Sequence, residues 1–402
     1  MNKPEEKKKR EPLFQIEKRD RATLMWKKML LIRGGSIFAA IITCGILSAI
    51  LLKANPFEFF GQILDGAFKT EQRVWILLRN TALLLGVALA IVPAFKMKFW
   101  NLGANGQVLI ACLMSTICMY YLGDKINKGL LIVIMFLVSV LSGAIWAVIP
   151  AIFKAIWKTN ESLFTLMMNY IAQGLVVYFL NVAINSNTGV LDPLEKAKVP
   201  ELANEYLLPI LVVAIMTAFI FVYMKYSKHG YEISVVGESE NTARYIGINV
   251  KKVVIRTLVI SGLLCGIMGF LLSGAIHGTV NKDIVENRGF TAIMVAWLAK
   301  FNPLIMILTS FFITFVDRGV QQAGRFYGLT NEALPNIMTA IIFFFIIGCE
   351  FFIEYKIKIR LKKKEEEEKV AQTETIVADT ELDQENASPT VDSEETKQEV
   401  TE

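Results

Sequence analysis

The stretch GFTAIMVAWLAKFNPLIMILTSFFITFV, residues 289–316, decides how this chain folds. As one helix it would be too long for a comfortable membrane crossing at ~1.5 Å per residue, and Asn302-Pro303 breaks it in the middle. A single crossing would also put the basic segment after residue 355 outside, against the excess of Lys and Arg that marks cytoplasmic segments. We therefore predict a re-entrant pair of half-helices, residues 289–301 and 303–316, that enter and leave on the outer side.

The remaining chain has the composition of a polytopic membrane protein. Of its 402 residues, 54% are hydrophobic and 26 are Phe. Apolar runs of about 18 to 24 residues are long enough to cross a hydrocarbon layer ~30 Å thick. We predict an all-α fold of about eight full transmembrane helices plus the re-entrant pair, with the full helices at residues 34–52, 75–95, 106–122, 129–151, 162–183, 206–226, 253–276 and 335–353.

The distribution of positive charge predicts the orientation. Segments that this arrangement puts inside hold 26 Lys and Arg, and those outside hold 11. Both termini are therefore predicted to be cytoplasmic, in a multi-pass protein of the cell membrane. We divide the chain into a basic cytoplasmic segment at 1–33, a transmembrane domain at 34–355 and a cytoplasmic tail at 356–402. The tail starts basic, turns acidic and lacks bulky apolar residues, so we expect it to be disordered.

Several chemistries have no support in the sequence. There is no GxxxxGK[ST] motif for a nucleotide phosphate. The two histidines and five cysteines lack the spacing of metal ligands, nucleophile and base pairs or disulfides. We therefore predict no catalytic residue, no metal, no cofactor and no nucleic-acid partner. No Asp or Glu falls near the middle of a predicted span, which weakens an ion-coupled carrier without excluding it.

A polar ladder runs along the predicted fifth helix, which Thr159 or Asn160 can cap. Its members recur every four residues and form one slowly winding stripe ~18 Å long: Glu161, Thr165, Asn169 and Gln173. Two interpretations are open. The stripe is either the wall of a substrate path that offers amide and hydroxyl hydrogen bonds, or a set of polar contacts between helices.

The predicted seventh helix carries small residues on one face: Gly262, Gly266, Gly269 and Ser273. This spacing is typical of a close packing seam between helices, and we assign it that role.

The longest predicted inner loop is GYEISVVGESENTARYIGINVKK, residues 230–252. Its glycines can bound two short turns, and residues 240–246 can form one or two helical turns with Ala243 and Ile246 on the same side. An ordered element that protrudes inward suits the docking of a cytosolic partner. The alternative is an ordinary structured loop.

Two segments are interrupted by Gly or Pro, one in each half of the chain. They are FWNLGANGQ at residues 99–107 and NRGFTAIMVAWLAKFNP at residues 287–303. Paired broken helices in two halves point to a transport site near the middle of the bilayer.

Four stretches together resemble the permease subunits of ABC importers, in the superfamily that handles ribose, simple sugars, nucleosides and branched-chain amino acids. They are KFWNLGANGQ (98–107), TNESLFTLMMNYIA (159–172), GYEISVVGESENTARYIGINVKK (230–252) and GFTAIMVAWLAKFNP (289–303). The resemblance is closest to the larger permease of guanosine-type nucleoside importers. The stretches occur in the family's order, and their combination is specific.

The resemblance implies a subunit that forms the translocation path of an ATP-driven importer, for nucleosides in particular, and is not itself an enzyme. Its implied partners are a homologous second permease, a cytosolic ATP-binding subunit on a separate chain, an extracellular substrate-binding lipoprotein and membrane lipid. By position, the coupling loop for the ATPase would include Gly237, Glu240, Asn241, Ala243 and Gly247.

The resemblance also implies path residues. Asn169 would lie in the path region, and the first broken segment would contain Asn101, Gly103, Gly106 and Gln107. Together with the ladder, this predicts five path residues: Thr165, Asn169, Gln173, Asn101 and Gln107. Three positions depart from the family pattern: Asn105 replaces an acidic residue, Ser234 an arginine and Lys300 a glycine. Ion pairs through the first two positions are therefore not expected.

Two other functions stay open at this point. A permease of the same class that imports simple sugars such as ribose would carry the same motifs. An ion-coupled secondary carrier is the alternative of another class. A receptor or scaffold that passes no substrate is disfavoured by the polar ladder.

Overall fold

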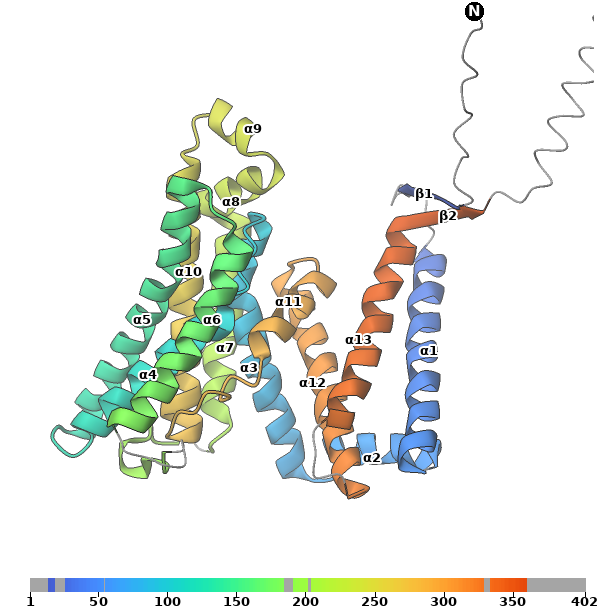
Figure 1. Cartoon of the computed structure of the whole chain (residues 1–402), viewed down its shortest axis with the longest axis horizontal. Helices are drawn as coiled ribbons and strands as arrows, with labels where there is room; N and C mark the ends of the chain where they lie inside the picture. The colour runs from blue at the N-terminus through green and yellow to red at the C-terminus, as the bar shows by residue number, and fades with distance from the viewer. Residues whose placement is uncertain are drawn as a thin grey trace, which may run out of the picture. The chain divides into compact units, whose positions relative to one another are not determined.

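A computed structural model describes residues 14–18, 26–53, 55–183, 191–201, 204–328 and 333–359 (Figure 1). The described residues are helical apart from loops and two short strands, which confirms the all-α membrane fold. The chain divides into two compact units, residues 41–343 and residues 1–40 with 344–402. Among the described residues, seven helices are long and apolar enough to cross a membrane.

The larger unit contains eleven complete α-helices within the described residues. They are α2 (Pro56–Phe68), α3 (Glu71–Lys96), α4 (Ala104–Leu122), α5 (Lys128–Trp157), α6 (Glu161–Tyr178), α7 (Leu207–Tyr226), α8 (Lys228–Glu238), α9 (Glu240–Tyr245), α10 (Val250–Phe270), α11 (Arg288–Leu298) and α12 (Pro303–Phe326). α6 continues into a π-helical turn, Phe179–Ala183, and α10 into another, Leu271–His277.

Capping residues place several of these helix starts where the sequence predicts them. The Asn160 side chain accepts a hydrogen bond from the Leu163 N–H at the start of α6. Asn302 does the same for Leu304 at the start of α12, with Pro303 in the first turn, where a missing N–H costs nothing. Glu161 in the first turn of α6 also pairs with Lys154 at 2.7 Å, which joins the end of α5 to α6.

The centre of the unit is formed by α3, α4 and α10. In each of them, 72% of the most apolar 18-residue stretch is buried. In the most apolar 18-residue stretch of α5, α6 and α7, only 28%, 39% and 33% is buried. A helix that is apolar all round yet exposed on one side fits a lipid boundary, because exposed apolar surface on this scale would not suit water.

The predicted small-residue seam lies where α10 meets its neighbours. A Cβ added at Gly262 or Gly266 would collide with the α5 backbone, at Gly143 and Val140 respectively. A Cβ at Gly269 would collide with Ala111 of α4. Ser273 donates its hydroxyl to the Gly269 carbonyl at 3.0 Å. The absence of side chains therefore allows α10 to lie close against both helices.

A second, smaller core surrounds α2 and the lower half of α12. Its buried members are Cys44, Phe59, Ile63, Val316, Val320, Ala323 and Met338. Gly319 belongs to the same contact, because a Cβ there would collide with Ile63. This core anchors the C-terminal half of α12 to α2, the helix that precedes α3.

The segment 289–316 follows a re-entrant path. After α10, Gly278 lies beside Leu194, and its carbonyl accepts the Leu194 N–H at 2.8 Å. α11 then leads to Phe301, whose ring stacks on Phe95 near the far end of α3. α12 returns, and Tyr327 after it stacks on Phe59 of α2 (Figure 1). Entry and exit therefore lie at the same end of the unit.

The predicted second half-helix, residues 303–316, is wrong in length. α12 has 24 residues and is one of the seven helices of spanning length. The sequence reading ended it at the charged pair Asp317-Arg318. Both side chains instead have polar partners, with Arg318 bound to Glu286 at 2.8 Å, so the charges do not terminate the helix.

The smaller unit contains a two-stranded antiparallel sheet of β1 (Phe14–Lys18) and β2 (Tyr355–Ile359), with Phe14 opposite Ile359. β1 precedes α1 (Trp26–Leu52) and β2 directly follows α13 (Ala333–Glu354). β1 and β2 therefore pair although they lie far apart in the sequence. The prediction of a disordered tail is wrong for residues 356–359, and residues 360–402 lie outside the described part. The cytoplasmic location of both termini stays a prediction.

Candidate functional site

The first broken segment needs hydrogen-bond partners, because backbone between helices inside an apolar bundle cannot use water. α6 supplies them. Thr165 Oγ1 accepts the Leu102 N–H at 3.1 Å, and Asn169 Oδ1 accepts the Gly106 N–H at 2.8 Å. The Asn169 amide also donates to the Leu102 carbonyl at 2.9 Å. The ladder thus holds the break between α3 and α4 in place.

Asn101 and Gln107 support the same break from inside. Asn101 Oδ1 accepts the Gly103 N–H at 3.1 Å and the Gln107 side-chain amide at 3.2 Å. The Asn101 amide donates to Ser261 of α10 at 3.4 Å. Both side chains are almost fully buried, at 0% and 1% exposure. Their contacts hold the break between α3 and α4 against α10.

The ladder therefore divides between the two interpretations that its spacing left open. Glu161 pairs with Lys154, and Thr165 is fully buried against the broken segment. Asn169 contacts backbone and also lines an open cavity, while Gln173 lines that cavity without a hydrogen bond to any described residue. Within the ladder, the role of path residue stays a prediction for Asn169 and Gln173.

The two broken segments meet at one contact. The Gly289 N–H in the first turn of α11 donates to Asn105 Oδ1 in the first turn of α4 at 2.7 Å. A Cβ at position 289 would lie 2.7 Å from the Asn105 backbone nitrogen, so only glycine allows this approach. Asn105, which departs from the family's acidic residue, thus pairs with backbone.

A cavity of about 140 Å³, partly open to solvent, lies beside this contact. Its walls come from α4, α6 and the connection from α10 to α11. The lining residues are Asn105, Gly106, Leu109, Leu166, Asn169, Tyr170, Gln173, Lys282, Asp283, Val285, Glu286, Asn287 and Phe290. Its mixture of apolar, aromatic and polar groups is that of a small-molecule site.

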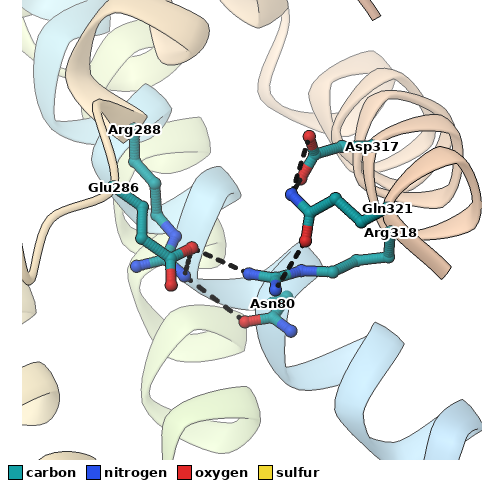
Figure 2. Close-up of polar contacts among 6 residues, drawn as sticks. All are labelled: Asn80, Glu286, Arg288, Asp317, Arg318 and Gln321. Atoms are coloured by element: carbon teal, nitrogen blue, oxygen red, sulfur yellow. Dashed lines mark hydrogen bonds and ion pairs between the residues drawn. The ribbon is translucent and has the colours of Figure 1, made fainter. Parts of the chain in front are cut away.

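A charged cluster lies next to the cavity (Figure 2). Glu286 Oε2 accepts hydrogen bonds from the Arg288 and Arg318 guanidinium groups, each at 2.8 Å. Arg288 also reaches Asn80 of α3 at 3.4 Å and has only 8% of its side chain exposed. Glu286 is half exposed. One carboxylate therefore joins α11 to α12.

Gln321 extends the cluster along α12. Its amide donates to the Asp317 carboxylate at 3.2 Å and its oxygen accepts from Arg318 at 3.5 Å (Figure 2). The expectation that no Asp or Glu falls near the middle of a span is wrong for Asp317, because α12 continues past it to Phe326. The sequence does not predict this cluster, because residues 277–288 and 317–334 fall between the predicted helices. The adjacent Asp317-Arg318 pair was the available signal.

The cluster keeps Glu286 ionised. Burial of the carboxyl acts to raise its pKa, but the guanidinium groups of Arg288 and Arg318 outweigh burial, so the Glu286 pKa lies below its ordinary value. Within the residues that the structure describes, no group of three or more His, Cys, Asp or Glu side chains could hold a metal ion.

The predicted coupling loop forms α8 and α9 at one end of the larger unit (Figure 1). Gly237 lies against the Lys96 carbonyl of α3, where a Cβ would collide with it. Gly247 has φ +82°, a left-handed conformation that favours glycine. Glu240 and Asn241 are exposed.

One prediction for this loop is wrong. Ala243 is fully buried and its carbonyl accepts the Ile248 N–H at 2.9 Å, whereas Ile246 is 54% exposed. The two side chains therefore do not share a side. Ala243 packs within its own chain, and the exposed apolar surface of α9 is provided by Ile246 and by Tyr245, which is 91% exposed.

The family model for the permease component of branched-chain amino acid transport systems matches residues 74–347. The chain belongs to this permease family. It is a multi-pass protein of the cell membrane, and the match covers the broken segments, the cavity and α8–α9.

The permease is similar over most of its length to curated relatives. A glucose ABC transporter permease of Haloferax volcanii is 25% identical and covers 81% of this chain and 88% of its own. A nucleoside ABC transporter permease of Lactococcus lactis is 24% identical, with 78% and 90% covered. A guanosine ABC transporter permease of Bacillus subtilis is 24% identical, with 64% and 76% covered.

Proposed function

We propose that this permease forms the translocation path of an ATP-driven importer whose substrates are nucleosides. The observation that carries the proposal is the contact between Asn105 and Gly289, which brings the two interrupted segments together beside an open polar cavity. Interrupted helices that meet at a cavity are the usual setting for a substrate site in membrane carriers. Relatives named for nucleosides and guanosine support the substrate class, and the glucose relative keeps simple sugars as the second candidate.

The proposed partners follow from the same assignment. A cytosolic ATP-binding subunit would dock on α8–α9, a homologous second permease would complete the path, and an extracellular lipoprotein would deliver substrate. Tyr245 and Ile246 support the docking site, since they expose apolar surface on an ordered helical turn. The chain itself would not hydrolyse ATP.

Uptake into membrane vesicles tests the transport function. Vesicles that contain the complete transporter should accumulate guanosine when ATP is supplied, and an uncoupler should leave the uptake unchanged. Accumulation that needs an ion gradient and ignores ATP would instead support a secondary carrier.

Two matched variants test the docking surface. Tyr245→Glu should express and fold normally but lose co-purification with the ATPase, because a charge at the interface must be desolvated. Ala243→Glu should destabilise α8–α9 itself, since the new carboxylate has no room in the buried site. If Tyr245→Glu keeps both its ATPase and normal uptake, the docking assignment is wrong.

A further inference from the structure

The cavity offers an unusual set of polar groups for its position. Gln173 and Asn287 line it, and their side chains make no hydrogen bond to any described residue. Lys282 and Asp283 also line it, without an ion pair in the described part of the chain. These side chains can therefore bind a ligand without first breaking contacts within the protein.

Glu286 is held in one orientation at the cavity wall. Both arginines contact the same oxygen, Oε2, and neither arginine lines the cavity. The second oxygen, Oε1, makes neither of these bonds. A carboxylate held through one oxygen by two guanidinium groups stays charged. It is a strong hydrogen-bond acceptor, because charge-assisted bonds are stronger than neutral ones.

The charge of the cavity argues against an anionic ligand. Asp283 and Glu286 line it against one cation, Lys282. A phosphate group would face two carboxylates. A neutral ligand that donates hydroxyl protons faces no such repulsion.

Two aromatic side chains complete the site. Tyr170 of α6 is 61% exposed and Phe290 of α11 is 39% exposed, and both line the cavity. Exposed rings beside polar groups can cover the flat face of a base or the apolar face of a sugar ring.

We infer that Glu286 accepts hydrogen bonds from the two hydroxyl groups of a vicinal diol on a neutral substrate, in the cavity between α4, α6 and α11. This inference rests on the proposed function and deepens it, because ribonucleosides and simple sugars both carry such a diol. Arg288 and Arg318 are positioning residues, which hold the carboxylate but do not touch the ligand. Tyr170 and Phe290 cover the rest of the substrate.

Equilibrium binding to the purified transporter in nanodiscs, without ATP or lipoprotein, tests the inference. The probes are guanosine, 2′,3′-dideoxyguanosine, guanosine 5′-monophosphate and D-ribose. Wild type should bind guanosine about 10- to 100-fold more tightly than the dideoxy analogue, as expected for hydrogen bonds to a charged group, and the monophosphate should bind more weakly than guanosine. Equal binding of guanosine and the dideoxy analogue to wild type would overturn the inference.

Variants separate recognition from structure. Glu286→Gln should bring guanosine affinity down to that of the dideoxy analogue, and Glu286→Asp should also reduce the difference while keeping a charge for the arginines. Arg318→Gln should weaken both ligands alike and keep their ratio. If Arg318→Gln abolishes the ratio while Glu286→Gln retains it, the carboxylate is not the acceptor.

Two arms identify the source of the diol and the level at which a failure occurs. If nucleosides are the substrate, Tyr170→Ala should weaken the binding of guanosine but not that of ribose. If sugars are the substrate, the variant should change both affinities by a similar factor. Preference for the diol without ATP-driven uptake would contradict the proposed function and support the site. ATP-driven uptake by a wild type that shows no preference for the diol would support the proposed function and contradict the site.

Discussion

The two broken segments of this permease are held by different chemistry. The first, between α3 and α4, is fixed by neutral amide and hydroxyl groups of Asn101, Thr165 and Asn169, which are almost fully buried. The second, residues 287–303, is fixed at its start by the ion pairs of Glu286 with Arg288 and Arg318 at a partly exposed site. When a buried hydrogen bond from a side-chain amide to the backbone is broken, no other partner is available. Water, in contrast, can replace the contacts of a half-exposed carboxylate. We expect the first segment to be rigid and the second to be movable.

The largest effect should follow from Asn169→Leu. The change leaves the Gly106 N–H and the Leu102 carbonyl without their partner, and we expect a loss of about 2 to 5 kcal/mol in the free energy of unfolding. Thermal unfolding of the purified protein measures it. Gln173→Leu, one turn further along α6, is the matched control and should change stability by less than about 0.5 kcal/mol. Equal stability of the two variants would show that the first segment is not locked by Asn169.

Gly289→Ala tests the contact where the two segments meet. The added methyl group would overlap the Asn105 backbone, and we expect a destabilisation of about 1 to 3 kcal/mol. Gly174→Ala is the matched control, because no atom lies within 4 Å of the added Cβ and helix propensity favours alanine by about 0.5 to 1 kcal/mol. The two variants should therefore shift the melting temperature in opposite directions. A shift in the same direction would contradict the close approach of α4 and α11.

Arg318→Gln should cost less, about 1 kcal/mol, because one of the two partners of Glu286 remains and the site is partly hydrated. The loss should shrink in high salt, since screening weakens exposed pairs. Melting temperatures at low and high ionic strength measure this. A loss as large as that of Asn169→Leu would remove the distinction between the two segments.

The smallest expected effect is a pH dependence of stability. The Glu286 pKa is lower in the folded protein than its ordinary value of 4.5, so folding is favoured by the ionised form. This contribution is present above about pH 4.5 and is lost as the pH falls through the lowered pKa. Melting curves from pH 6 to pH 3 should fall more steeply for wild type than for Glu286→Gln. Parallel curves would mean that the ion pairs add nothing.

Much of this fold could be predicted from the sequence because apolar length and capping residues act locally. The runs that predict the helices, the Asn302-Pro303 break and the Asn160 cap all fall where the structure has them. The placement of the two broken segments in the two halves predicts a transport site near the middle of the bilayer, and the structure joins the segments by a contact between Asn105 and Gly289.

The features that could not be predicted depend on distant partners. Asp317 and Arg318 looked like a helix end because their partners Gln321 and Glu286 lie on the next turn and on another segment. Ala243 looked like a surface residue because its burial depends on how α9 folds back on its own chain. The alternation in YKIKI at residues 355–359 is typical of a strand, but the same residues are also basic, which predicts a cytoplasmic segment after the last helix.

The pairing of β1 with β2 bears on the order in which the chain is assembled. Phe14 pairs with Ile359, so this sheet joins residues that are separated by most of the sequence. Contacts between such distant residues pay the largest loop-closure entropy and form late. During synthesis, β1 must wait until α13 has been made and inserted before its partner exists. The sheet is therefore the last described element that can form, and its closure marks a chain whose helices are already in the membrane.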